Sequence, residues 1–151
     1  MAAALHELGT QRAFVVRGER LDELPLDGSG VIIDVSPAGI ERREVSAGDH
    51  GLPEAHTDAF VGGDETANAE RIVAILQDRD QGPRHDVVAL NAGASLVVAG
   101  RADDLRSGVE LAVETIASGA AGTQLERLRA SARAGAPAHE AAPADGGGLA
   151  S

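Results

Sequence analysis

The sequence predicts an α/β fold, because short apolar runs rich in Val and Ile alternate with longer segments of helical periodicity. The apolar runs are followed by Gly, Ser or Asn, as strands often are. The longer segments repeat apolar residues every three or four positions, which is the spacing of one helix face. We therefore expect a partial parallel or mixed sheet flanked by helices.

The first predicted strand is 13–17, an apolar run that leads into Gly18. Residues 31–35 and 40–45 are the second and third, and the short turn between them allows only an antiparallel hairpin. Residues 86–90 form another continuous apolar run, for which we predict a fourth strand with both faces buried.

Helices are expected where apolar residues recur at helical spacing or where a capping residue precedes such a run. Asp64 and Asn91 are the expected N-caps of two of them, and Gly9 and Gly100 the expected ends of two. In the predicted helix 103–117, apolar residues from Leu105 to Ile116 share one side. The predicted helices cover 1–8, 67–76, 92–99, 103–117 and 123–132.

Length and composition indicate one domain over 1–132, followed by an Ala-, Gly- and Pro-rich tail, 133–151, that we expect to be disordered. The formal net charge of −11 argues against nucleic acid or an anionic membrane surface as a partner. The absence of cysteine excludes disulfides and thiolate metal sites. No apolar run is long enough to span a membrane, and the first residues do not resemble a signal peptide. We expect a cytoplasmic protein.

Asp22 and Glu23 are the best candidate site residues. They follow the predicted strand 13–17 directly, and open α/β sheets bind ligands beyond the carboxyl ends of their strands. The alternative is a solvated acidic turn, for example the cap of a short helical turn, and acidic proteins contain many such pairs. On these residues alone both interpretations stay open.

Two other patterns favour structural roles. Gly62-Gly63-Asp64 resembles the start of a phosphate loop, but it lacks the spacing of one, and the Asp64 carboxylate would repel a phosphate. We interpret it as a turn followed by a helix cap. The histidines show no metal-ligand spacing and are expected on the surface or in loops; they are His6, His50, His56, His85 and His139.

Several segments together, in order and spacing, resemble the C-terminal half of the anthranilate phosphoribosyltransferase family over about residues 2–130. The resemblance implies the C-terminal part of a nucleoside phosphorylase/phosphoribosyltransferase catalytic domain. The segments that carry it are Leu5–Gly9, Arg12–Gly18, Leu21–Leu24, Gly62–Ala69, Gly82–Ala92 and Ala99–Gly108.

This resemblance implies a reaction in tryptophan biosynthesis, in which the amine of anthranilate displaces pyrophosphate from phosphoribosyl pyrophosphate. It also implies Mg²⁺ as cofactor, with Asp22 and Glu23 aligned to the acidic pair that helps to hold the metal. Carboxylate oxygens suit this ion, which uses one or two carboxylates together with substrate phosphate.

Other parts of the family pattern are not found in this sequence: the glycine-rich Gly-Thr-Gly-Gly-Asp phosphate loop, the Lys-containing basic loop and the anthranilate-contacting Arg. The resemblance places them in an N-terminal half, so we expect the isolated chain to be inactive. Two positions also depart from the pattern. Arg17 stands where the family usually has His, and Arg20 where it usually has Gly. If position 20 requires a positive φ, Arg there costs about 1 kcal/mol.

Two alternatives to a transferase stay open. The chain could be a non-catalytic fragment or a binding partner of a separate N-terminal half. It could also belong to a related enzyme of the pyrimidine nucleoside phosphorylase type, although the region of Asp22 and Glu23 shows no match to that family.

Overall fold

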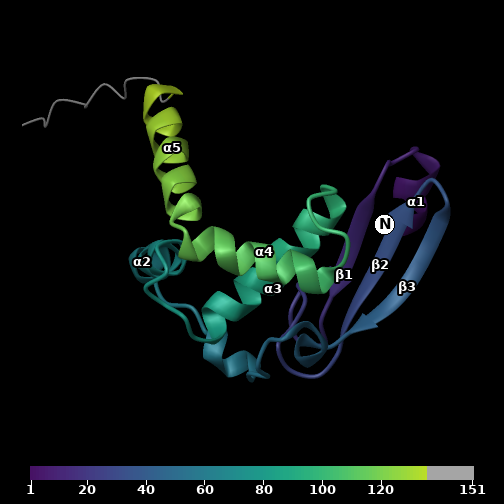
Figure 1. The fold of residues 1–151 in the computed structure, drawn as a ribbon, viewed down its shortest axis with the longest axis horizontal. Coiled ribbons are helices and arrows are strands. Elements are labelled where there is room, and N and C mark those ends of the chain that lie inside the picture. Colours follow the sequence, from purple (N-terminus) through teal and green to yellow (C-terminus); the bar gives the residue numbers. More distant parts are fainter. Residues whose placement is uncertain (136–151) are drawn as a thin grey trace, which may run out of the picture.

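The computed structural model describes residues 1–135, in which a small sheet at one end is joined to a group of helices (Figure 1). The strands are β1 (Ala13–Arg17), β2 (Gly30–Ser36) and β3 (Gly39–Val45). The α-helices are α1 (Ala2–Glu7), α2 (Glu65–Leu76), α3 (Pro83–Val98), α4 (Leu105–Ala117) and α5 (Ala120–Gly135), and the short 3₁₀ helices are η1 (Ala47–His50) and η2 (Thr57–Phe60).

The sheet has the order β1-β2-β3, and both strand pairs are antiparallel. Val15 lies opposite Ile33, which in turn lies opposite Arg42. The α/β class and the β2–β3 hairpin are confirmed, whereas the parallel pairing that the sequence suggested does not occur among the described strands. Within residues 1–135, β1 pairs only with β2, so the other edge of β1 carries no strand.

The predicted strand 86–90 is wrong, because these residues belong to α3. Gly82 is the N-cap of this helix and Pro83 occupies its first turn, where a missing N–H costs nothing. The apolar run then continues through the predicted helix 92–99 as one element. A short apolar run does not by itself distinguish a buried strand from a buried helix. Asn91 is therefore not a cap but a residue of the helix interior.

Helices α3 and α4 pack against each other through two glycines, Gly93 of α3 and Gly108 of α4. A Cβ atom on Gly93 would lie 2.7 Å from the backbone nitrogen of Val109. Only residues without a side chain permit this approach of two helix backbones. The predicted apolar side of α4 is confirmed, since Leu105, Val109 and Ile116 are buried. Asp104 begins the helix with a capping box that includes Ser107.

The main core lies where the sheet meets the helices. Leu24 and Leu26, from the loop between β1 and β2, are fully buried there with Ile32 of β2. Leu90 of α3 and Val109 of α4 complete the contact from the helical side. The loop after β1 is thus part of the core, although it has no regular secondary structure.

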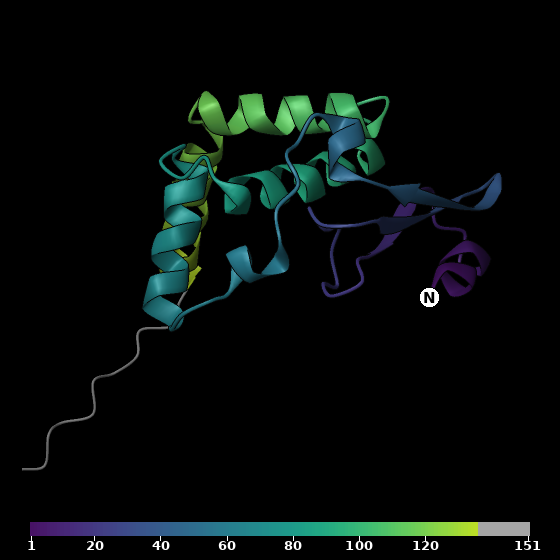
Figure 2. The same ribbon diagram turned by 90° about the horizontal axis from the view of Figure 1, so that it is seen from below.

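Helices α2 and α5 lie side by side at the end remote from the sheet (Figure 2). The predicted cap of α2 is confirmed, because the Asp64 carboxylate accepts a hydrogen bond of 2.8 Å from the Ala67 amide. Residues 133–135 of the predicted tail belong to α5, and 136–151 lie outside the described residues. Among the described residues, no helix is long and apolar enough to cross a membrane.

Candidate functional site

The loop between β1 and β2 carries Asp22 and Glu23, and both side chains are exposed. Immediately after β1, the Gly18 amide donates a hydrogen bond of 2.9 Å to the Leu21 carbonyl, which closes a tight turn. The two carboxylates therefore lie just beyond the carboxyl end of β1, where the sequence placed them.

Glycines permit close packing of this loop. A Cβ atom on Gly18 would lie 3.0 Å from the Glu23 carbonyl oxygen, and one on Gly30 would lie 2.8 Å from Cδ of Pro25. Pro25 is buried between these two glycines. The backbone on both sides of the acidic pair is therefore held in a restricted space.

Asn91 holds the same loop from the helical side. Its Oδ1 accepts a hydrogen bond of 2.9 Å from the Leu24 amide, and its Nδ2 donates one of 3.0 Å to the Leu24 carbonyl. Nδ2 also donates to the Val87 carbonyl of α3 at 3.0 Å. The side chain thus satisfies both backbone groups of Leu24, the residue that follows the acidic pair.

Asp27 fixes the far end of the loop. Its Oδ2 accepts hydrogen bonds from the Thr57 hydroxyl at 2.9 Å and the Thr57 amide at 3.1 Å. The hydroxyl donor is the main reason why the pKa of Asp27 lies below its ordinary value. Because Thr57 begins η2, this contact joins the loop to the segment that leads to α2.

Although they are neighbours in sequence, Asp22 and Glu23 line different hollows. Glu23 borders a hollow of about 680 Å³ between β1 and α3, which we call the β1–α3 groove. The groove is lined from β1 by Phe14 and Val16, and from α3 by Val88, Asn91, Ala92 and Val98. Asp22 borders a hollow of about 440 Å³ on the other face of β1, with Val15 and Ile33. The pair therefore faces both sides of the strand end.

The donor set fits a magnesium ion. Within residues 1–135, neither carboxylate of the pair takes part in a side-chain hydrogen bond or an ion pair, and no group of three or more His, Cys, Asp or Glu gathers there. Mg²⁺ retains several waters and takes one or two carboxylates plus substrate phosphate, so each of these water-accessible carboxylates suits the ion as a ligand, and the two border different hollows.

The two arginines that depart from the family pattern are both exposed. Asp78 is the one non-glycine residue with positive φ in the described part of the chain, so Arg20 does not carry the backbone strain considered above. Its guanidinium instead lies 3.3 Å from Nε2 of His56, the residue that caps η2.

Two features of this region were not found from the sequence. Asn91 was expected to cap a helix; its position inside an apolar run was the one available signal of a buried polar contact. His85 was expected on the surface, but it is buried, with Nδ1 3.0 Å from Oδ1 of Asp86. His85 lies in the first turn of α3, which begins at Pro83.

Comparison with known proteins identifies the family. Residues 1–122 match the model of the glycosyl transferase family, a/b domain. The chain belongs to this glycosyl transferase family. It is 48% identical, over 137 residues, to the anthranilate phosphoribosyltransferase of Roseiflexus sp. (strain RS-1). That match covers 89% of this chain and 40% of the relative, so the chain spans about 40% of the length of this curated relative.

Solved structures of anthranilate phosphoribosyltransferases agree with the fold. The anthranilate phosphoribosyltransferase of Thermus thermophilus superposes with a TM-score of 0.80 at 39% identity, over 87% of this chain and 39% of that one. The anthranilate phosphoribosyltransferase of Saccharomyces cerevisiae in complex with PRPP and Mg superposes with a TM-score of 0.72 at 21% identity. This match covers 82% of this chain and 36% of that one. The family resemblance stated from the sequence is confirmed.

Proposed function

We propose that this chain supplies the Asp22–Glu23 part of an anthranilate phosphoribosyltransferase site, which acts in tryptophan biosynthesis. The observation that carries the proposal is the pair of exposed carboxylates at the end of β1, which have no side-chain partners in the described part of the chain and precede Leu24, the residue that Asn91 holds. The relatives that this chain matches are named for this reaction. The absence of cysteine is consistent with a reducing cytoplasm.

In the proposed reaction, the bond between the anomeric carbon and the pyrophosphate oxygen breaks, and a bond forms from that carbon to the anthranilate nitrogen, which loses a proton. Negative charge grows on the departing pyrophosphate. Mg²⁺, held by Asp22 and Glu23, would neutralise this charge. The contribution of the protein is to hold the backbone that carries the two carboxylates, through the contact of Asn91 with Leu24.

The remaining groups of the site are proposed to come from the part of the relatives' chain that this sequence does not match. About 60% of the length of the Roseiflexus relative lies outside the match, which covers 40% of it. We therefore expect residues 1–151 alone to be inactive and the chain to act together with that part.

The test combines this chain with the unmatched part of the Roseiflexus relative by co-expression. Loss of anthranilate fluorescence is followed after addition of phosphoribosyl pyrophosphate and Mg²⁺. We expect consumption by the pair and none by either part alone. Asp22→Asn and Glu23→Gln should each lower the rate by at least about tenfold, because metal-site substitutions commonly have effects of this size.

Glu19→Gln is the matched control, since Glu19 is an exposed carboxylate of the same loop that lies outside the site. It should leave the rate unchanged. Full activity of the Asp22→Asn pair would show that the acidic loop is not part of the site. A stable but inactive complex would favour the non-catalytic alternative, and phosphorolysis of a pyrimidine nucleoside would favour the phosphorylase alternative.

A further inference from the structure

Arg20 brings a positive charge into the loop that carries the acidic pair. It lies two residues before Asp22 and is exposed, as are both carboxylates of the pair. An arginine side chain is long and flexible, and a guanidinium bound to these carboxylates would repel a metal ion. Within residues 1–135, however, no ion pair joins Arg20 to Asp22, Glu23 or any other carboxylate. The loop therefore keeps its guanidinium and its acidic pair apart.

The partner of Arg20 is an imidazole. Nη1 of Arg20 lies 3.3 Å from Nε2 of His56, across 36 positions of the sequence. A guanidinium has donors only, so Nε2 accepts this hydrogen bond, and the proton of the neutral ring then lies on Nδ1. Nδ1 lies 3.1 Å from Oδ2 of Asp58, to which it donates, while the Asp58 amide is farther away at 3.4 Å. Asp58, His56 and Arg20 thus form one chain of hydrogen bonds.

The residues on either side of His56 fix its position beside the loop. The Ala55 amide donates a hydrogen bond of 3.4 Å to the carbonyl of Leu26, a fully buried residue of the loop. On the other side, the hydroxyl and the amide of Thr57 donate to the Asp27 carboxylate at 2.9 Å and 3.1 Å. The backbone that carries the imidazole is therefore attached to the same loop that carries Arg20.

We infer that His56 is a positioning residue of the proposed metal site, which holds the Arg20 guanidinium away from Asp22 and Glu23 and so leaves both carboxylates free for Mg²⁺. The inference rests on the proposed function for the presence of the metal. A neutral imidazole suits this task, because it accepts from the guanidinium without adding another negative charge to the loop. His56 is 59% exposed, so we expect a modest effect on the affinity for the metal.

The first measurement is the affinity for Mn²⁺, which takes the same kind of oxygen ligands as Mg²⁺. The electron paramagnetic resonance signal of the free ion is followed during titration of the chain alone and of the co-expressed pair. His56→Ala should weaken binding about two- to fivefold, because the released guanidinium pairs with the acidic loop and exposed ion pairs have about this strength. Unchanged affinity of His56→Ala would overturn the inference.

Arg20→Ala distinguishes positioning from a general structural role of His56. Without the guanidinium His56 has nothing to hold, so the double variant should bind Mn²⁺ within about 1.5-fold of Arg20→Ala alone. An equal loss with and without Arg20 would overturn the inference.

Arg101→Ala is the matched control, since it removes the same charge from an exposed position after α3. Val97, near that end of α3, contacts Arg12 just before β1, whereas the acidic pair follows β1. Arg101 is therefore remote from the site, and His56→Ala should cause its full loss of affinity in the Arg101→Ala background.

A second measurement needs no metal. Two-bond nitrogen–proton NMR correlations of the His56 ring report which nitrogen carries the proton. At mildly alkaline pH, where imidazoles are neutral, we expect the proton on Nδ1 in the unsubstituted chain and a shift of population toward Nε2 in Arg20→Ala. The same tautomer populations in both proteins would show that the contact with Arg20 is not made in solution, and the inference would fail.

Asp22→Asn separates a failure of this inference from a failure of the proposed function. If Asp22→Asn weakens Mn²⁺ binding and His56→Ala does not, the metal site stands and the positioning role is overturned. If Asp22→Asn binds Mn²⁺ unchanged, or if neither the chain nor the pair binds it, the acidic pair is not the metal site. The proposed function then loses its support, and the positioning role is overturned with it.

Discussion

At the scale of single residues, Asn91 connects the candidate site to the interior of the protein. Its side chain bonds both the amide and the carbonyl of Leu24, which is fully buried. Removing the side chain leaves those backbone groups without partners, and a buried unpaired polar group costs about 1–3 kcal/mol. Asn91→Ala should therefore lower the free energy of unfolding by about 2 kcal/mol, as measured by urea denaturation.

The control for this prediction lies one turn further along α3. Ser95 is exposed, and its hydroxyl donates only to the Asn91 carbonyl of the same helix. Ser95→Ala should change the free energy of unfolding by less than about 0.5 kcal/mol. Equal stabilities of the two variants would show that the Leu24 contact is not a stabilising one.

His50 gives a prediction about pH. Its Nδ1 is buried without a hydrogen-bond partner in the described residues, and burial lowers its pKa, with the nearby Asp49 acting in the opposite direction. The unfolded chain then binds a proton more readily than the folded one, so stability is lost as pH falls below about 6.5. His50→Gln should reduce the fall in melting temperature between about pH 7.5 and pH 5.5.

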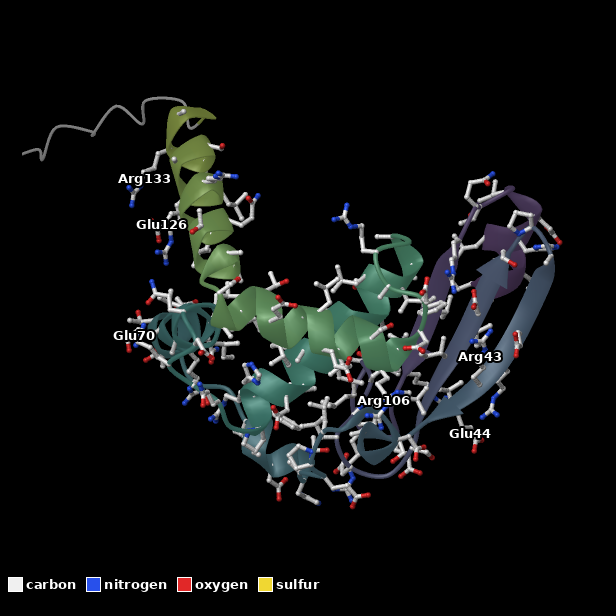
Figure 3. The ribbon with its side chains drawn as sticks, viewed as in Figure 1. Arg43, Glu44, Glu70, Arg106, Glu126 and Arg133 are labelled. Atoms are coloured by element: carbon white, nitrogen blue, oxygen red, sulfur yellow. The ribbon has the colours of Figure 1, made fainter. Side chains whose placement is uncertain are left out.

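His56→Gln is the comparison for this experiment, because it also removes one imidazole but from an exposed position. It controls for the loss of one imidazole from the chain. If both variants behave alike, His50 does not titrate differently in the folded and unfolded states. Three charged groups lie near His50: Asp49 of η1, Asp104, which caps α4, and Arg106 of α4. Arg106, labelled in Figure 3, donates a hydrogen bond of 3.0 Å to the Asp49 carbonyl.

The sequence identified Asp22 and Glu23 as candidates but not the contacts that hold them. Their place after a strand could be predicted from local pattern alone. The contact between Asn91 and Leu24 joins residues 67 positions apart, and a single sequence carries no signal for such a pair. The same holds for Asp27 and Thr57, which form their contact across 30 positions.

At the scale of elements, the contact between α3 and α4 depends on Gly93. An alanine there would place its Cβ 2.7 Å from the backbone nitrogen of Val109, so the helices must move apart. Overpacking of this kind costs about 1–3 kcal/mol, and the better helix propensity of Ala returns up to about 1 kcal/mol. Gly93→Ala should lower the free energy of unfolding by about 1–2 kcal/mol in urea denaturation.

Gly48→Ala tests the same substitution without the close contact. The nearest atom to a Cβ at that position is Oγ of Ser46, at 3.8 Å, and the residue does not require a positive φ. Its stability should stay within about 0.5 kcal/mol of the unsubstituted chain. A Gly93→Ala variant as stable as Gly48→Ala would mean that the two helices separate without cost.

The elements that the sequence predicted well have one buried side. The β2–β3 hairpin has a short turn, and α4 has a single apolar face, so local pattern was sufficient for both. Helix α3 was misassigned because it is covered from more than one direction, by α4 on one side and by Leu24 and Leu26 of the loop on another. Its apolar residues therefore show no clear helical period, and the first half resembled a buried strand.

At the scale of the whole molecule, Arg12 connects the sheet to the helices. Its guanidinium donates to the Val97 carbonyl at the end of α3 at 3.2 Å and lies 3.5 Å from the buried Asp34 carboxylate of β2. Arg43 of β3, labelled in Figure 3, approaches the same carboxylate at 3.4 Å. Arg12→Ala leaves Asp34 with one cationic partner and should destabilise the chain by about 1–2 kcal/mol in urea denaturation.

Arg42→Ala is the matched control on the same sheet. Its partner is Glu44, and both side chains are at least 60% exposed. Exposed pairs contribute about 0–1 kcal/mol, so a change of no more than about 0.5 kcal/mol is expected. Similar effects of the two substitutions would indicate that Arg12 contributes only as a surface charge and does not join the sheet to the helices.

The anchored loop after β1 has a consequence for protease resistance. Arg20 is an exposed trypsin site in a segment without regular secondary structure, which would ordinarily be cut quickly. A protease must draw several residues into an extended form, and here that requires Leu24 and Leu26 to leave the core and Asn91 to release the backbone. Cleavage after Arg20 should therefore follow the unfolded fraction of the whole chain, with the rate rising in proportion as urea increases that fraction.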